Sequence, residues 1–367
     1  MNVVVVAAHG LGCHWLSPYG NSWVATSAVD ALAAESTVFD RHFADEPTPM
    51  GFRRSCPTEI HQSFRAAGIT ANLIDDRKER IPDDRPWSFV WPTNPAIHAT
   101  PADALSAAVK MALDQRATRS PWLLWIETDR LLPPWDLELE TYQQYAATSG
   151  GFAEEMNSEE VEPTDEPTPG PFVPDDDRHW HQLHNSFAAA VTSFDIELAA
   201  IFSTFREHRL DQSTALILTS GYGWPLGEHG IVGPRGSRMH EDLVHVPLIV
   251  RLPGEHRDNR RVSAFTQVSD LGPTLLDLFG IPPGGRSLVP LMTGAQVPWR
   301  DSARTAREQE HAIRTDEWAF LPANDAHPAR LYRKPDDIWE VNDIAATHLD
   351  ECDRLAALLD GPKEPTS

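Results

Sequence analysis

The sequence predicts an α/β fold in which helices flank a mostly parallel sheet, followed by a small C-terminal α+β subdomain. Residues 3–8 (VVVVAA) form a continuous apolar run, which is typical of a parallel strand buried on both faces. Similar runs then alternate with segments of helical periodicity, as βαβ units require. After about residue 300 this alternation ends. We therefore expect an α/β domain over residues 1–300 and a separate subdomain over residues 301–367.

The other elements follow from local patterns along the chain. Further strands are expected at residues 37–43, 70–74, 88–91, 122–126, 215–220 and 246–252. Helices are expected at residues 26–35, 55–67, 101–117, 179–208 and 271–279. Gly68 and Gly280 would end two of these helices, and Pro101 suits the first turn of another. Beyond residue 300, residues 311–321 and 330–333 suit antiparallel strands, and residues 345–359 an amphipathic helix.

The charge balance argues against two classes of partner. The 367 residues include 31 Lys and Arg against 54 Asp and Glu, which gives a formal net charge of −23. A general nucleic-acid binder concentrates Lys and Arg, and docking on anionic lipid needs the same. We therefore expect neither a nucleic-acid nor a membrane partner.

One segment interrupts the α/β pattern. Residues 154–177 contain ten acidic residues, five prolines and no basic residue. Such a stretch cannot bury a core, so we expect a solvated insertion of disordered type over residues 150–177. The alternative is a lid or a loop that collects cations.

Cysteine usage and the N-terminal residues bear on the compartment. The three cysteines (Cys13, Cys56 and Cys352) fit no zinc-binding spacing, and their odd number makes a poor disulfide framework. The apolar run 3–8 is too short to cross a bilayer, and no charged segment or cleavage site accompanies it. We expect a reduced, cytoplasmic setting.

Several short motifs occur in an order known from one family. Residues 17–21 read SPYGN, residues 29–35 VDALAAE, residues 226–230 LGEHG, residues 246–250 VPLIV and residues 270–277 DLGPTLLD. In this order they resemble the sulfatase family of the alkaline-phosphatase superfamily, over nearly the whole chain. The resemblance implies that family's fold. It also implies a calcium ion held by two Asp after the first strand and an Asp–Asn/His pair after a later one, and a formylglycine nucleophile made from the Cys of a CxPxR motif.

The carboxylates of the family metal site are missing at both expected positions. The Asp pair after the first strand falls on His9-Gly10, and the first acidic residue of the chain is Asp30. The later pair falls on Ser220-Gly221, and no acid lies between Thr214 and Glu228. Since calcium takes several oxygen ligands, we expect no metal cofactor at this place.

The family nucleophile is also absent. Its Cys position falls on Pro49 or Met50, neither of which can attack a substrate. Thr48 is adjacent and is a candidate nucleophile, although a hydroxyl needs a base or a metal for activation. His9 is a second catalytic candidate, as nucleophile or general base.

The residues that remain near the expected site are basic. The resemblance places Arg53, Arg54, His229 and Arg235, together with His9, in loops that carry the active site of the family. Because Arg pairs well with sulfate, phosphate or carboxylate, we predict an anion-binding group at these positions. The alternative for each residue is a structural or surface salt bridge.

A histidine cluster stands apart from these motifs. His179, His181 and His184 lie at the start of the expected long helix, after Asp175–177. They could bind zinc or copper, or they could be exposed polar residues.

Three functions remain open from the sequence. The first is a sulfatase-like pseudoenzyme that binds a small sulfated, phosphorylated or carboxylated ligand, or a partner. The second is an active sulfuric or phosphoric ester hydrolase with a rebuilt active site. The third is a structural protein that makes contacts through the acidic insertion and the C-terminal subdomain.

Overall fold

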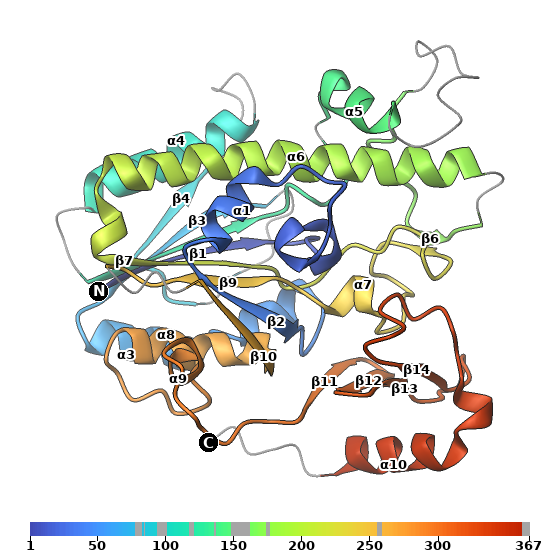
Figure 1. The fold of residues 1–367 in the computed structure, drawn as a ribbon. Coiled ribbons are helices and arrows are strands. Elements are labelled where there is room, and N and C mark those ends of the chain that lie inside the picture. The colour runs from blue at the N-terminus through green and yellow to red at the C-terminus, as the bar shows by residue number, and fades with distance from the viewer. Residues whose placement is uncertain are drawn as a thin grey trace.

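The computed structural model describes residues 1–77, 83, 85–93, 101–116, 121–135, 137–147, 162–173, 177–254 and 259–361. An eight-stranded, mostly parallel sheet forms the centre, and helices cover both of its faces (Figure 1). Its strands are β1 (Asn2–Ala8), β2 (Thr37–Phe43), β3 (Thr70–Asp76), β4 (Phe89–Pro92), β5 (Trp122–Thr128), β7 (Thr214–Thr219), β9 (Leu248–Arg251) and β10 (Arg260–Gln267). This confirms the predicted fold class.

The strand order explains why residues far apart in the sequence meet at one edge. The order is β10-β2-β9-β7-β1-β5-β3-β4, and β9 runs antiparallel to both of its neighbours. β1 pairs in parallel with β5 and β7, with Val3 opposite Leu123 and Ala215. Carboxyl ends of parallel strands lie at the same edge of a sheet. The segments that follow β1, β5 and β7 are therefore neighbours.

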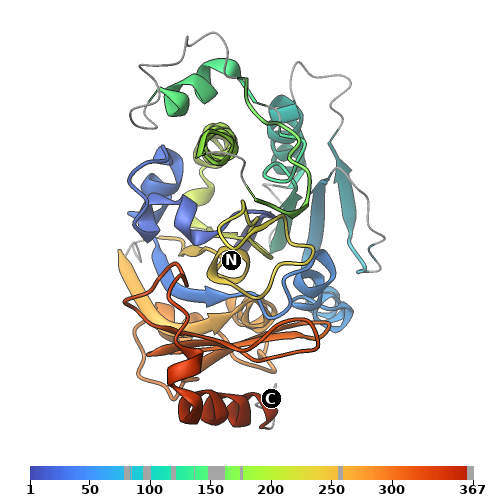
Figure 2. The same cartoon turned by 90° about the vertical axis from the view of Figure 1, so that its right-hand side faces the viewer.

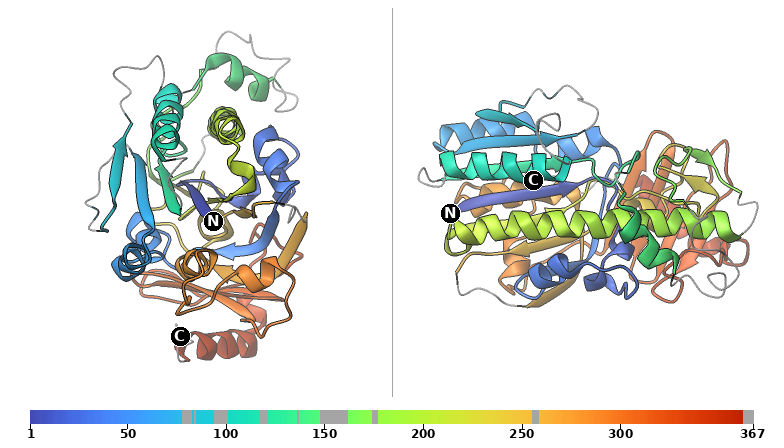
Figure 3. Two further views of the ribbon diagram at one scale, coloured as in Figure 1. Left: turned by 90° about the vertical axis from the view of Figure 1, so that its left-hand side faces the viewer. Right: turned by 90° about the horizontal axis from the view of Figure 1, so that it is seen from above.

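The helices form one layer on each face of the sheet. They are α1 (Ser27–Ala33), α2 (Pro49–Arg54), α3 (Thr58–Ala66), α4 (Pro101–Arg116), α5 (Leu139–Ala146), α6 (Asp177–Glu207), α7 (Glu241–Val244), α8 (Leu271–Leu278) and α9 (Val289–Met292). α1, α4 and α6 lie on one face, while α3 and α8 lie on the other (Figure 3). Along β1, Val4 and Val6 pack into the core beneath α6, and Val3 and Val5 into the opposite core. The strand is buried on both faces, as its sequence predicts.

α6 is the long central helix of its layer and runs along the length of the sheet (Figure 3). It is the one helix of the described chain that is long and apolar enough to cross a membrane, yet 61% of its apolar window is buried inside the protein. Phe187, Val191 and Leu198 belong to the core. These properties are those of a core helix.

A second, antiparallel sheet packs against the main sheet near the ends of β2 and β7. It consists of β11 (Ser302–Arg307), β12 (Glu310–Thr315), β13 (Trp318–Leu321) and β14 (Arg330–Arg333), in that order. Ala312 and Leu321 on one face share a core with Phe43 and Tyr222 of the main sheet region. The other face carries α10 (Leu349–Asp360) (Figure 2). This confirms the predicted antiparallel strands and helix, while a domain boundary at residue 300 stays a prediction.

Several elements differ from expectation, and for α3 and β10 the reason can be identified. Residues 55–67 hold the helix α3 from Thr58 only, because Pro57 cannot continue a helix from its preceding residues. α2 precedes it as a separate short helix. The strands β10 and β11 were not expected, since β10 is an edge strand with exposed arginine and serine side chains and shows no apolar run.

Part of the acidic insertion lies among the described residues. Residues 150–161 and 174–176 lie outside the described residues, but residues 162–173 are placed. Within them, β6 (Gly170–Pro171) pairs with β8 (Ile231–Val232), and the carbonyl of Asp165 accepts from the amide of Trp135. Backbone hydrogen bonds thus hold residues 162–173 to the domain although most of them are exposed, while a disordered type for the insertion as a whole stays a prediction.

Candidate functional site

The carboxyl ends of β1, β5 and β7 form the edge where the resemblance places an active site. The amide of His9 donates to the carbonyl of Thr128 (3.0 Å), and the amide of Gly10 donates to the carbonyl of Tyr222 (2.9 Å). Gly10 and Gly223 form an isolated parallel bridge. The two expected metal-ligand segments are therefore adjacent in space.

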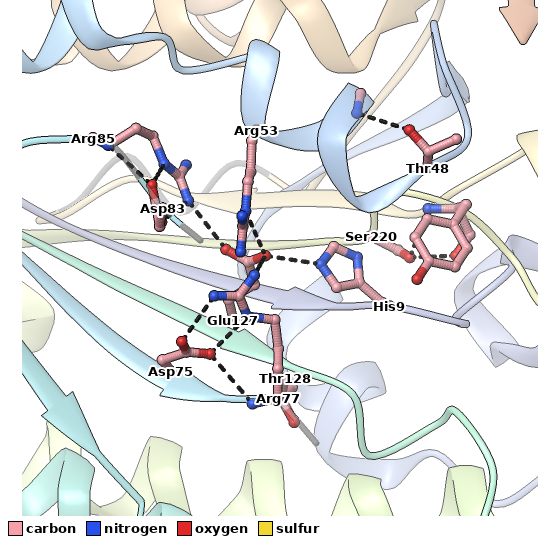
Figure 4. A network of polar contacts seen from close by, with 12 residues as sticks. His9, Thr48, Arg53, Asp75, Arg77, Asp83, Arg85, Glu127, Thr128 and Ser220 are labelled. Atoms are coloured by element: carbon pink, nitrogen blue, oxygen red, sulfur yellow. Dashed lines mark hydrogen bonds and ion pairs between the residues drawn. The ribbon is translucent and has the colours of Figure 1, made fainter. Parts of the chain in front are cut away.

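A buried glutamate occupies the centre of this edge. Glu127, next to last in β5, accepts a hydrogen bond from His9 Nε2 at 3.3 Å (Figure 4). Arg53 and Arg77 approach the same carboxylate oxygen at 3.9 and 3.2 Å, and Arg85 approaches the other oxygen at 3.3 Å. We call Glu127 with these four partners the Glu127 network. Sequence analysis missed Glu127, because the apolar run of β5 predicts a strand that ends one residue earlier.

The arginines of the Glu127 network are neutralised within the protein. Arg77 makes two hydrogen bonds to the carboxylate of Asp75, at 2.6 and 2.8 Å. Arg85 makes two to Asp83, at 2.9 and 2.8 Å. The three arginines therefore face three carboxylates, and charge-assisted, bidentate pairs of this kind are strong. No unpaired positive charge is left by these contacts for an external anion.

The pKa values of Glu127 and Asp83 are both lowered by their positively charged partners. Burial alone would raise the pKa of Glu127, but the hydrogen bond from His9 and the charges of Arg85 and Arg53 hold this pKa below its usual range. At Asp83, burial likewise acts upward, and the bonds from Arg85 lower the pKa to about 2. Both groups are thus ionised near neutral pH.

The Glu127 network is closed to solvent. The side chains of His9 and Glu127 are both 0% exposed. The His9 ring stacks on Tyr222 (centroids 5.2 Å apart, 6° between planes) and meets the edge of Phe52. A catalytic histidine must reach its substrate, whereas aromatic rings and Glu127 enclose this one.

The residues at this edge do not suit the calcium ion of the resembling family. Calcium takes about six to eight oxygen ligands. Of the described side chains in the Glu127 network, the carboxylate of Glu127 already has four partners. A Cβ atom at Gly221 would lie 2.8 Å from Cβ of Phe52 and 3.0 Å from Nδ1 of His9. At Gly10, φ is +94° and a Cβ would lie 2.8 Å from the carbonyl oxygen of Leu131. Neither position has room for the missing carboxylate.

Thr48 has a structural task in this fold. It is the N-cap of α2, and its Oγ1 accepts a hydrogen bond from the amide of Gly51 at 2.9 Å. The hydroxyl itself donates to Glu46 (3.3 Å). Figure 4 shows Thr48 on the far side of α2 from Glu127. Its contacts are those of a helix cap.

The four predicted anion-binding residues have separate surroundings. Arg53 is buried in the Glu127 network. Arg54 is 64% exposed and pairs with Glu46. His229 stacks on His240, with ring centroids 3.7 Å apart, and Arg235 is exposed. The structure therefore does not bring them together as one basic pocket, and the salt-bridge alternative describes Arg53 and Arg54.

The histidines at the start of α6 also separate. His184 is buried, stacks on Trp180, and its Nε2 donates to Glu228 at 3.2 Å. His179 is exposed, and His181 is half-buried. Among the described residues, the group of side chains close enough together to hold a metal ion is a different one, formed by His229, His240 and Glu340.

This second group lies at a cavity of about 370 Å³ between the loop 227–240 and the C-terminal sheet. Burial, with the neighbouring His240, lowers the pKa of His229 to about 4. Asp242 also lines the cavity, and burial together with Glu228 and Glu340 raises its pKa well above the usual value. Sequence analysis singled out only His229 of these residues, because Glu340 meets His240 only through the packing of the C-terminal segment on the main domain.

Comparison with known proteins identifies the family. Residues 81–281, more than half of the chain, match the family model described as Sulfatase. The chain belongs to the sulfatase family. Residues 227–347 also match the model of the C-terminal region of N-sulphoglucosamine sulphohydrolase. This confirms the family resemblance inferred from the motifs.

Curated sulfatases are similar over part of their length. Arylsulfatase K of Gallus gallus is 29% identical over 178 residues, which cover 43% of this chain and 33% of the relative. N-acetylglucosamine-6-O-sulfatase of Bacteroides thetaiotaomicron is 26% identical over 182 residues, or 45% of this chain and 32% of the relative. The similarity thus spans about a third of the length of these sulfatases.

Solved structures extend the similarity in fold to nearly the whole chain. The phosphonate monoester hydrolase of Agrobacterium radiobacter aligns with 98% of this chain and 94% of its own at a TM-score of 0.72 and 18% identity. The structure of BT4656 in complex with its substrate D-glucosamine-2-N,6-O-disulfate aligns over 98% and 96%, at a TM-score of 0.77 and 16% identity. At such identities the likeness is one of fold.

Proposed function

We propose that this sulfatase-family protein does not hydrolyse sulfate esters and that the Glu127 network has replaced the reaction centre. The observation that carries the proposal is the position of Glu127, whose carboxylate faces His9 at the edge where the family motif would place metal ligands. The proposal extends the sequence-based expectation of a non-catalytic pseudoenzyme. It adds a specific contact to that expectation, the hydrogen bond between His9 and Glu127, which the sequence analysis did not predict.

The charge distribution supports this proposal. Hydrolysis of a sulfate ester needs positive charge or hydrogen-bond donors directed at the oxygens that gain charge in the transition state. Arg53, Arg77 and Arg85 are directed at carboxylates of the protein instead. A sulfate group would have to displace Glu127 from these partners, and breaking such a buried pair costs about 3–5 kcal/mol.

The enclosure of His9 supports it further. No substrate can approach a fully buried ring that is stacked on Tyr222 and bonded to Glu127 without opening this part of the core. The hydroxyl of Thr48 is held by its own helix. His9 and Thr48, the two catalytic candidates, therefore each have a structural role: His9 is a buried partner of Glu127, and Thr48 is a helix cap.

Turnover measurements test the proposal. The purified protein is assayed on aryl sulfates, phosphomonoesters and phosphodiesters with added Ca²⁺, Mn²⁺ or Zn²⁺. We expect no hydrolysis above that of a His9→Ala variant prepared in parallel. Hydrolysis by the wild-type protein that His9→Ala or Glu127→Gln abolishes, while both variants remain folded by circular dichroism, would overturn the proposal.

A second candidate function is an ester hydrolase with a rebuilt active site. The observation in its favour is the His9–Glu127 hydrogen bond, because a histidine oriented by a carboxylate is the usual arrangement of a general base. In that case His9→Ala would lower turnover by about 10²–10⁴-fold. The same assay thus separates the two functions.

A further inference from the structure

We infer that His229, His240 and the carboxylates beside them form a binding site for a first-row transition-metal ion, with Zn²⁺ as the reference ion, at the junction of the main domain and the C-terminal sheet. The inference goes beyond the proposed function and is independent of it. It concerns residues that take no part in the Glu127 network.

Three segments bring the cluster together, and one of them is distant in sequence from the other two. His229 lies in the loop between β7 and β8, and His240 is the N-cap residue of α7. Glu340 comes from the loop after β14. One potential ligand atom from each residue lies within 4.8 Å of the other two. Donor atoms around tetrahedral zinc are about 3.4 Å apart and direct their lone pairs at one ion, so the His229 ring must turn out of its stacking on His240 before both rings can bind it.

Glu340 supports His240 in the way that carboxylates support metal-bound histidines. Its Oε2 accepts from Nδ1 of His240 at 2.8 Å, so the lone pair of the neutral imidazole is on Nε2. Arg314 and Lys334 hold the other carboxylate oxygen at 3.0 and 3.4 Å. The ring orientation and tautomer of His240 are therefore fixed by buried contacts before any ion arrives.

The cavity next to these rings contains donor atoms without a partner. Asp242 is 7% exposed, and its Oδ1 has no hydrogen-bond partner among the described residues. The ring nitrogens of His229 likewise make no hydrogen bond within the described chain. A buried carboxylate oxygen without a partner is costly, and a cation in the cavity would satisfy it. The cavity, of about 370 Å³, is large enough for an ion with bound water.

The donor set selects the class of ion. Two imidazoles with carboxylate oxygens suit Zn²⁺, Co²⁺ and similar ions, whereas calcium prefers oxygen donors only. We assign His229 and His240 as ligands, and Glu340 as the residue that positions His240. The third protein ligand is assigned to Asp242, which lines the same cavity but lies outside the group of atoms within 4.8 Å of one another. Because Glu340 follows the C-terminal sheet and accepts the hydrogen bond of His240, an ion bound to His240 would strengthen the contact between that sheet and the main domain.

Metal binding is tested on tag-free, full-length protein that has been dialysed against a chelator. Titration with Zn²⁺ followed by calorimetry is expected to give one ion per chain. Co²⁺ should produce visible absorption bands typical of nitrogen and oxygen donors in a four-coordinate shell. Excess Zn²⁺ should raise the Tm by roughly 5 °C, since an ion that binds only the folded state stabilises it.

Variants decide which residues hold the ion. His229→Ala and Asp242→Asn should abolish the Co²⁺ bands and the Tm shift, while Glu340→Gln should weaken Zn²⁺ binding by about 10–100-fold and retain the bands. His181→Ala on α6 is the matched control and should bind as the wild type does. No saturable binding by the wild-type protein, unchanged binding by His229→Ala, or loss in His181→Ala would each overturn the inference. Circular dichroism of every variant confirms that it is folded.

Discussion

Nε2 of His9 lies 3.3 Å from Oε1 of Glu127, and both side chains are withdrawn completely from solvent. The pair joins the ends of β1 and β5, and Arg53, Arg77 and Arg85 surround it. In this sulfatase-family chain, the strand ends at this edge are therefore held by ion pairs between side chains of the protein itself.

Loss of the charge on Glu127 should destabilise the protein strongly. Glu127→Gln leaves buried arginines facing a neutral amide, so we expect the free energy of unfolding to fall by about 3–5 kcal/mol. Urea denaturation followed by circular dichroism measures it. The control is Glu46→Gln, which removes the half-buried partner of the exposed Arg54 and should cost about 0–1 kcal/mol. Equal effects of the two changes would contradict a structural role of the Glu127 network.

The contribution of Asp83 to the free energy of unfolding should disappear at acidic pH. Its pKa is lowered to about 2 in the folded protein, from an ordinary value near 3.8. A depressed pKa stabilises the fold above the ordinary value, and this stabilisation is lost as the pH falls through the folded value. Asp83→Asn should therefore cost on the order of 2 kcal/mol at pH 7 and much less at pH 2–3. A pH-independent difference between the urea stabilities of wild type and variant would contradict this assignment.

Introduction of a carboxylate at Gly221 should damage the fold rather than create a calcium site. The new side chain would collide with Phe52 and His9, and overpacking of this kind costs about 1–3 kcal/mol. Thermal unfolding of Gly221→Asp with and without Ca²⁺ measures both effects, and Gly221→Ala isolates the clash from the charge. A stable Gly221→Asp protein whose Tm rises with Ca²⁺ would show that the edge can still accept the ion.

Thr48 should behave as a helix cap in mutagenesis. Thr48→Ala removes the acceptor for the Gly51 amide and is expected to cost about 1 kcal/mol, whereas Thr48→Ser keeps an oxygen at the same position and should restore most of it. Urea midpoints of the two variants report this difference. If Thr48 were a nucleophile, Thr48→Ala would instead remove turnover without a comparable loss of stability.

More of the fold than of the site could be predicted from the sequence, because strand composition is a local property and the site depends on tertiary packing. Runs such as residues 3–8 and 215–220 are buried on both faces, so their composition alone marks them as central strands. The absence of acids at Gly10 and Gly221 was likewise readable from the sequence. Glu127 was not, because a single acid at the end of an apolar strand normally faces water. Only the packing of Arg77 and Arg85 against it makes the residue part of a site.

The metal-ligand cluster was hidden for a related reason. His229 belongs to a motif, but His240 and Glu340 are separated by 99 intervening residues that contain the whole C-terminal sheet. No short spacing pattern connects them, whereas the His179, His181 and His184 group had such a pattern. The structure separates that group and directs His184 toward Glu228. Proximity in sequence was therefore a poor guide to which histidines meet.

The two glycines at the site edge have a consequence for the engineering of this protein. Phe52 and His9 lie against Gly221, and the Leu131 carbonyl lies against Gly10. An aspartate placed alone at either position would collide with these neighbours. Installation of carboxylates at this edge would therefore need several coordinated substitutions, including smaller side chains around the new groups.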